Sequence, residues 1–93
     1  MLVGVCRLEI FVPESSSLKS KRFVLSSIKK RIRNKFNVSV AEVENNDKWQ
    51  RISLGISMVS NERKFIDMNV EEILKLIESD GRMEILSHLV EVY

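Results

Sequence analysis

The residues with the clearest chemical role in this sequence are the basic side chains clustered between residues 18 and 36. Eight lysines or arginines and no acidic residue occur from Lys19 to Lys35, although the chain of 93 residues has a formal net charge of only +2. Residues 1–40 hold nine basic and two acidic residues, whereas residues 41–93 hold six basic and eleven acidic ones. This asymmetry predicts a protein with one basic side, a feature that favours binding to a polyanion.

The spacing of these residues places many of the charges in one stripe. At 100° per residue, six apolar residues share an arc about 120° wide, which predicts an amphipathic helix of roughly 18 residues. They are Leu18, Val24, Leu25, Ile28, Ile32 and Phe36. Opposite this arc lie five basic residues, with Phe23 at their edge: Lys19, Arg22, Lys29, Lys30 and Arg33. An inert helix face usually mixes charges of both signs, because like charges three or four residues apart cost about 0.2–0.5 kcal/mol per pair. The stripe therefore favours phosphates of a nucleic acid, with a solvated face or an acidic protein partner as alternatives.

Two further groups of residues have chemistry suited to a nucleic acid. Trp49 and Arg51 flank an amide side chain just after the turn residues 45–48, and such an aromatic ring can stack on an unpaired nucleotide. The alternative for Trp49 is that it closes the end of a small core. The serines at 15–17 precede the basic helix, where free N–H groups attract a phosphate, and the alternative there is a hydroxyl cap supplied by Ser17.

Residues for catalysis or metal binding are scarce. His88 is the only histidine and Cys6 the only cysteine, so a metal site would lack nitrogen and sulfur ligands, and no catalytic Ser-His-Asp or Cys-His partnership is identifiable. The Gly-rich loops of nucleotide-binding proteins and of acylphosphatases are absent as well. We therefore expect a protein that is not an enzyme and has no metal and no cofactor. The single cysteine and the lack of a signal-peptide pattern or an apolar run of about 20 residues predict a cytoplasmic protein without a membrane span.

The basic helix is one of six predicted elements. Alternating apolar and polar residues predict strands over residues 2–12 and 49–59. The Val-rich residues 37–44 predict another strand, whose inward face is ambiguous because valines lie on both sides, and the tail 83–93 predicts a fourth. A second amphipathic helix follows Ser60 or Asn61 as its cap and stops at Gly81. The order β-α-β-β-α-β predicts one α+β domain over residues 1–93, a ferredoxin-like sandwich with two helices on one face of a four-stranded antiparallel sheet. Its first and third strands would lie at the centre, with Cys6 under the helices.

The opposite face of this sheet is too apolar to be fully exposed to water. It would present Arg7, Glu9, Arg51 and Ser53 among four apolar residues: Val3, Val5, Phe11 and Val59. RNA-binding sheets of this fold usually carry two or three central aromatic residues, and here only Phe11 is a candidate. The face therefore favours an interface, either of a homodimer or with another protein.

Long blocks of the sequence carry a family resemblance: "VGVCRLEI", "SLKSKRFVLSSIKKRIRNKFNVSVAEV", "DKWQRISLGISMVSN" and the closing apolar strand. With these blocks the chain resembles the YlxP-like family of small bacterial domains of unknown function. The resemblance runs almost end to end and implies a ferredoxin-like fold without an established activity. Family members are often encoded beside genes for translation initiation and ribosome maturation, which implies RNA or a ribosomal particle as the partner. The loop "PESSS" departs from the smaller, Gly-containing loop of the family.

Overall fold

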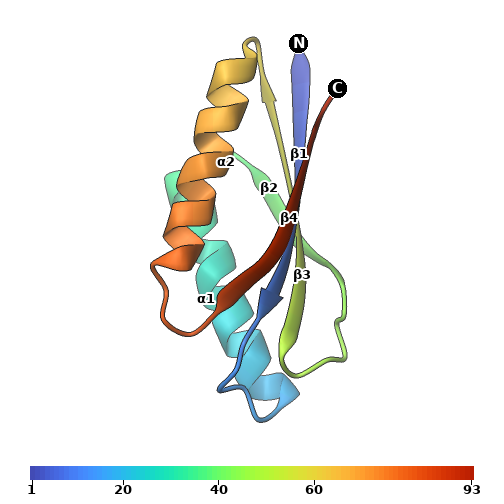
Figure 1. Cartoon of the computed structure of the whole chain (residues 1–93), viewed down its shortest axis with the longest axis vertical. Helices are drawn as coiled ribbons and strands as arrows, with labels where there is room; N and C mark the ends of the chain where they lie inside the picture. The colour runs from blue at the N-terminus through green and yellow to red at the C-terminus, as the bar shows by residue number, and fades with distance from the viewer.

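The computed structural model describes all residues from Met1 to Tyr93. Its elements are β1 (Leu2–Phe11), α1 (Leu18–Lys35), β2 (Ser39–Glu44), β3 (Arg51–Ser60), α2 (Arg63–Glu78) and β4 (Glu84–Val92). The strands form one antiparallel sheet in the order β2-β3-β1-β4, so β1 and β3 are central. Figure 1 shows both helices on the same side of this sheet. The predicted α+β ferredoxin-like architecture is confirmed. Neither helix has the length and apolarity required to cross a membrane.

The core fills the layer between the sheet and the helices. Alternate residues of β1 point into it, and Leu8 and Ile10 are completely buried there. Cys6 is buried in the same row, under the helices as predicted. This burial raises the pKa of its thiol. The inward face of residues 37–44 was ambiguous from the sequence; Val40 is the buried residue of β2 and lies opposite Ile56 of β3.

The predicted ends of the second helix were wrong. The N-cap of α2 is Glu62, so neither Ser60 nor Asn61 caps this helix. Ser60 is the last residue of β3, opposite Leu2, and its hydroxyl accepts the amide of Glu62 at 3.2 Å. Gly81 does not stop the helix either, since α2 ends at Glu78 and no glycine has a positive φ. The turn into β4 is held by Asp80, whose carboxylate accepts the amide of Arg82 at 3.0 Å.

Candidate nucleic-acid interface

α1 presents the predicted stripe on the side away from the core. Its buried arc contacts the sheet, while Lys19, Arg22, Lys30 and Arg33 are exposed and Lys29 is half-buried. None of these five residues forms an ion pair, although the protein has ten ion-pair contacts in total. Five unneutralised positive charges therefore lie along about 21 Å of helix.

Arg33 differs from the other four members of the stripe. Its Nη2 donates a hydrogen bond to the backbone oxygen of Val40, at 3.0 Å. This bond attaches the C-terminal part of α1 to β2, which is an edge strand of the sheet. Arg33 thus contributes charge from a fixed position, whereas the side chains of the other four make no hydrogen bond within the protein and can reach outward.

The beginning of α1 forms a hydroxyl cap. Ser17 Oγ accepts the amide of Ser20 at 3.1 Å, and Ser20 Oγ in turn accepts the amides of Ser16 and Ser17, both at 3.2 Å. Ser15 is buried, and its hydroxyl donates to the backbone oxygen of Ser17. Of the two alternatives left by the sequence, the structure shows the cap: these serines bind one another and the helix end.

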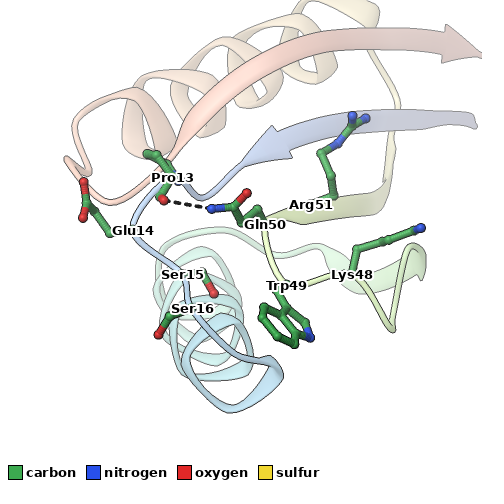
Figure 2. Close-up of a pocket in the computed structure, with 8 residues that line it drawn as sticks. All are labelled: Pro13, Glu14, Ser15, Ser16, Lys48, Trp49, Gln50 and Arg51. Atoms are coloured by element: carbon green, nitrogen blue, oxygen red, sulfur yellow. Dashed lines mark hydrogen bonds between the residues drawn. The ribbon is translucent and has the colours of Figure 1, made fainter.

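A hollow of about 650 Å³ lies beside this end of α1 (Figure 2). The loop after β1 forms one wall and the residues entering β3 form the other: Pro13, Glu14, Ser15, Ser16, Lys48, Trp49, Gln50 and Arg51. The walls are joined, because Gln50 Nε2 donates to the oxygen of Pro13 at 3.0 Å and the Val12 amide donates to the oxygen of Gln50 at 2.9 Å. Trp49 is 56% exposed and lies outside the core, so the interpretation that it closes the core is wrong.

Arg51 lines the hollow but does not point toward the ring of Trp49. Figure 2 shows its side chain running away from the indole. Its Nη2 donates to Glu9 Oε2 at 3.2 Å, on the sheet face without helices, and its buried Nε has no partner. The predicted pairing of Trp49 with Arg51 around one nucleotide is therefore not the arrangement in the structure.

Glu9 organises a polar network on that open face. Its carboxylate accepts hydrogen bonds from Ser53 Oγ at 2.6 Å and Arg7 Nε at 3.0 Å, and Arg7 also pairs with Glu44. Partial burial raises the pKa of Glu9, but the bonds from Ser53, Arg7 and Arg51 outweigh it, so the pKa lies below its ordinary value. Glu9 thus stays ionised and holds Arg51 away from the hollow.

The predicted interface residues divide into a patch and a separate residue. Val3 lies opposite Val59, and Val5 follows on the same face, so these three form one apolar patch at the end of the sheet that holds both chain termini. Val59 is 65% exposed and Val5 is 38% exposed. Phe11 lies about 26 Å from Val3 along the strand. The polar network separates them, so Phe11 is not part of this patch.

Lys21 has a structural role that was not predicted from the sequence. Its side chain is completely buried, and Nζ donates to Glu42 Oε2 at 2.7 Å and to the backbone oxygens of Asn45 and Asn46 at 2.9 and 3.2 Å. All three ammonium hydrogens therefore have acceptors. The sequence does indicate this burial, since at 100° per residue Lys21 falls in the middle of the apolar arc of the helix. Lys21 joins α1 to the turn that leads to Trp49.

Comparison with solved structures confirms the class of protein. The de novo designed protein Foldit4 superposes with a TM-score of 0.57 at 19% identity, covering 100% of this chain and 97% of that chain. A second de novo design with a ferredoxin fold, LFR1 1, gives a TM-score of 0.54 at 13% identity, covering 98% and 86%. At such identities these matches define the fold alone: this is a ferredoxin-like domain.

Sequence comparison then defines the family. Residues 3–90 match the family described as "Protein of unknown function (DUF503)". The chain is also 39% identical over 83 residues to "Uncharacterized protein YlxP" of Bacillus subtilis (strain 168), which covers 89% of this chain and 90% of that protein. The protein belongs to this YlxP-like family, as the sequence blocks predicted.

Proposed function

We propose that this protein is a non-enzymatic accessory domain that binds RNA, free or within a ribosomal particle, through the outer side of α1. The supporting observation is the stripe of Lys19, Arg22, Lys29, Lys30 and Arg33, in which no positive charge is neutralised by an acid of the same chain. Phosphates placed along this stripe would supply the missing negative charge and release condensed counterions.

The second helix shows that an ordinary solvated face of this protein looks different. On and beside α2, Arg63 lies 3.8 Å from Asp67, Lys64 lies 3.4 Å from Glu62, and Lys75 lies 3.7 Å from an acid one turn earlier. The basic residues of α2 are thus interspersed with acids, whereas the stripe on α1 contains none. This contrast favours a binding role for the stripe over a merely solvated face.

The test is the salt dependence of RNA binding. Five phosphate contacts predict a slope of log affinity against log salt of roughly −3.5 to −4.5. Changing Arg22→Gln together with Lys29→Gln should flatten the slope by nearly two, and by the same amount for RNAs of different sequence, because phosphates carry no base identity. The matched control is Arg63→Gln with Lys64→Gln, which removes the same charge from α2. Absence of RNA binding at low salt, or equal effects of the two double variants, would refute the proposal.

A second candidate function is self-association or protein binding through the open sheet face. The observation that favours it is the patch of Val3, Val5 and Val59, which is extended by exposed Leu89 and Tyr93 of the neighbouring chain end. An apolar surface of this kind often marks an interface. It lies on the other layer of the molecule from α1, so both candidate functions can be present in one protein (Figure 1).

A further inference from the structure

The hollow beside Trp49 has the volume of a ligand site and is lined mostly by polar residues. Its volume of about 650 Å³ falls within the range of 300–1,000 Å³ that is usual for small-ligand pockets. Its two walls come from segments far apart in sequence, and the bonds of Gln50 to Pro13 and of Val12 to Gln50 fix them. Lys21 anchors the turn behind the second wall. The hollow is therefore pre-formed.

Trp49 provides an exposed stacking surface in this hollow. It is the only tryptophan of the chain, and the residue is 56% exposed. Two other aromatic rings are covered by a cation, Phe36 by Lys35 and Phe65 by Lys64, but no cation of the protein lies over the indole. A large flat ring left open at the rim of a hollow suits stacking with another flat ring, such as a nucleobase.

Polar groups around the ring suit the rest of a nucleotide. Gln50 uses its Nε2 on Pro13, while its Oε1 has no partner, and the Ser16 hydroxyl has none either. The free oxygen of Gln50 can bond the edge of a base. Lys48 is exposed and makes no ion pair, so it can contact a phosphate, whereas Glu14 makes the opposite rim acidic and unsuited to one.

The position of the hollow links it to the stripe. Ser16 lies three residues before Lys19, the first charge of the stripe, so the hollow lies at the end of α1 where the stripe begins. An RNA backbone that follows α1 would bring its next nucleotide to Trp49. A paired base is unavailable for stacking on a side chain, so that nucleotide must be unpaired.

We infer that the hollow binds one unpaired nucleotide of an RNA whose adjoining backbone lies along the stripe. This inference rests on the proposed function and defines its substrate class: a helical RNA segment next to a bulge, a junction or a single-stranded end. The base stacks on Trp49, Lys48 contacts the phosphate, and the free Oε1 of Gln50 bonds the base edge.

Fluorescence of the single tryptophan tests this directly. A short RNA hairpin with one bulged adenine should quench Trp49 saturably and bind about 5- to 150-fold more tightly than the same hairpin without the bulge, the range given by stacking of 1–3 kcal/mol. In Trp49→Leu, with affinity measured by filter binding, this preference should fall to about one. Trp49→Phe should keep part of it. Phe65→Leu removes an exposed aromatic ring from α2, away from the hollow, and should keep the preference fully.

The outcomes separate this inference from the proposed function. Equal affinity for both hairpins with the steep salt slope retained would overturn the nucleotide site and leave the stripe as the RNA-binding surface. If neither hairpin binds at low salt, the proposed function fails. Titration with adenosine monophosphate then tests separately whether the hollow binds a nucleotide. Quenching of Trp49 that requires Lys48 would support a nucleotide site, and the absence of such quenching would overturn it.

Discussion

Replacing the buried lysine of α1 should destabilise the protein far more than replacing any lysine of the stripe. Lys21→Met keeps the length of the side chain and its helix propensity, so it opens no large cavity and leaves the helix backbone unperturbed. What it removes is the ammonium group. The Glu42 carboxylate, only 12% exposed, then loses its counterion, and the backbone oxygens of Asn45 and Asn46 lose their donor.

The expected loss follows from leaving a buried charge unpaired. Removing one partner of a buried ion pair typically costs about 3–5 kcal/mol. This is a large part of the roughly 5–15 kcal/mol by which small domains are stable. Each kcal/mol lowers the melting temperature of a domain of this size by about 4–8 °C, so Lys21→Met should melt at least about 12 °C below the parent.

Thermal and urea unfolding, followed by circular dichroism and by Trp49 fluorescence, measure this loss. Lys30→Met is the matched control, because it makes the same change on the exposed side of the same helix and should cost less than about 0.5 kcal/mol. In Lys21→Met with Glu42→Met both charges are gone, and the double variant should be more stable than the sum of the single losses predicts. If Lys21→Met and Lys30→Met have the same stability, the ion pair does not hold the turn as described.

Three other predictions concern separate parts of the protein. The Cys6 thiol should react with a thiol reagent far more slowly in the native protein than after unfolding, because it is buried. Equal rates would contradict the register of β1 that places Cys6 in the core. The pKa of Asp80 is lowered to about 2, mainly by hydrogen bonding from Arg82, so its stabilising effect should be complete above pH 3.8 and lost as the pH falls toward 2. The stability gap between the parent and Asp80→Asn should therefore close over that range in acid titrations, and a constant gap would contradict this. Light scattering should show a dimer that Val5→Lys weakens; a monomer at high concentration would remove self-association through the apolar patch.

Local periodicity was enough to predict most of the fold. The alternation in residues 2–12 and the 3.6-residue repeat after Ser17 depend only on which side of an element must avoid water, so strands, helices and their buried faces follow from neighbouring residues. The order of elements then left few arrangements in which the sheet covers the apolar faces of both helices. The stripe on α1 was predictable for the same reason, since its members are at most 14 residues apart on one helix. The N-cap of α2 was not predictable in this way, because Ser60 belongs to β3 and pairs with Leu2, which is distant in the sequence.

The candidate site depends instead on contacts between distant segments. Gln50 meets Pro13 across 37 positions of the chain, and Arg51 turns to Glu9 across 42. The acceptors of Lys21 lie 21 to 25 residues further along. Which acceptor a polar side chain finds is settled only once strand register and turns have placed both partners. The sequence by itself therefore determined the basic stripe and the sheet beneath it. Only the tertiary structure decided that the loop before α1 and the turn before β3 enclose a hollow, that Trp49 is open to it, and that Arg51 is directed elsewhere.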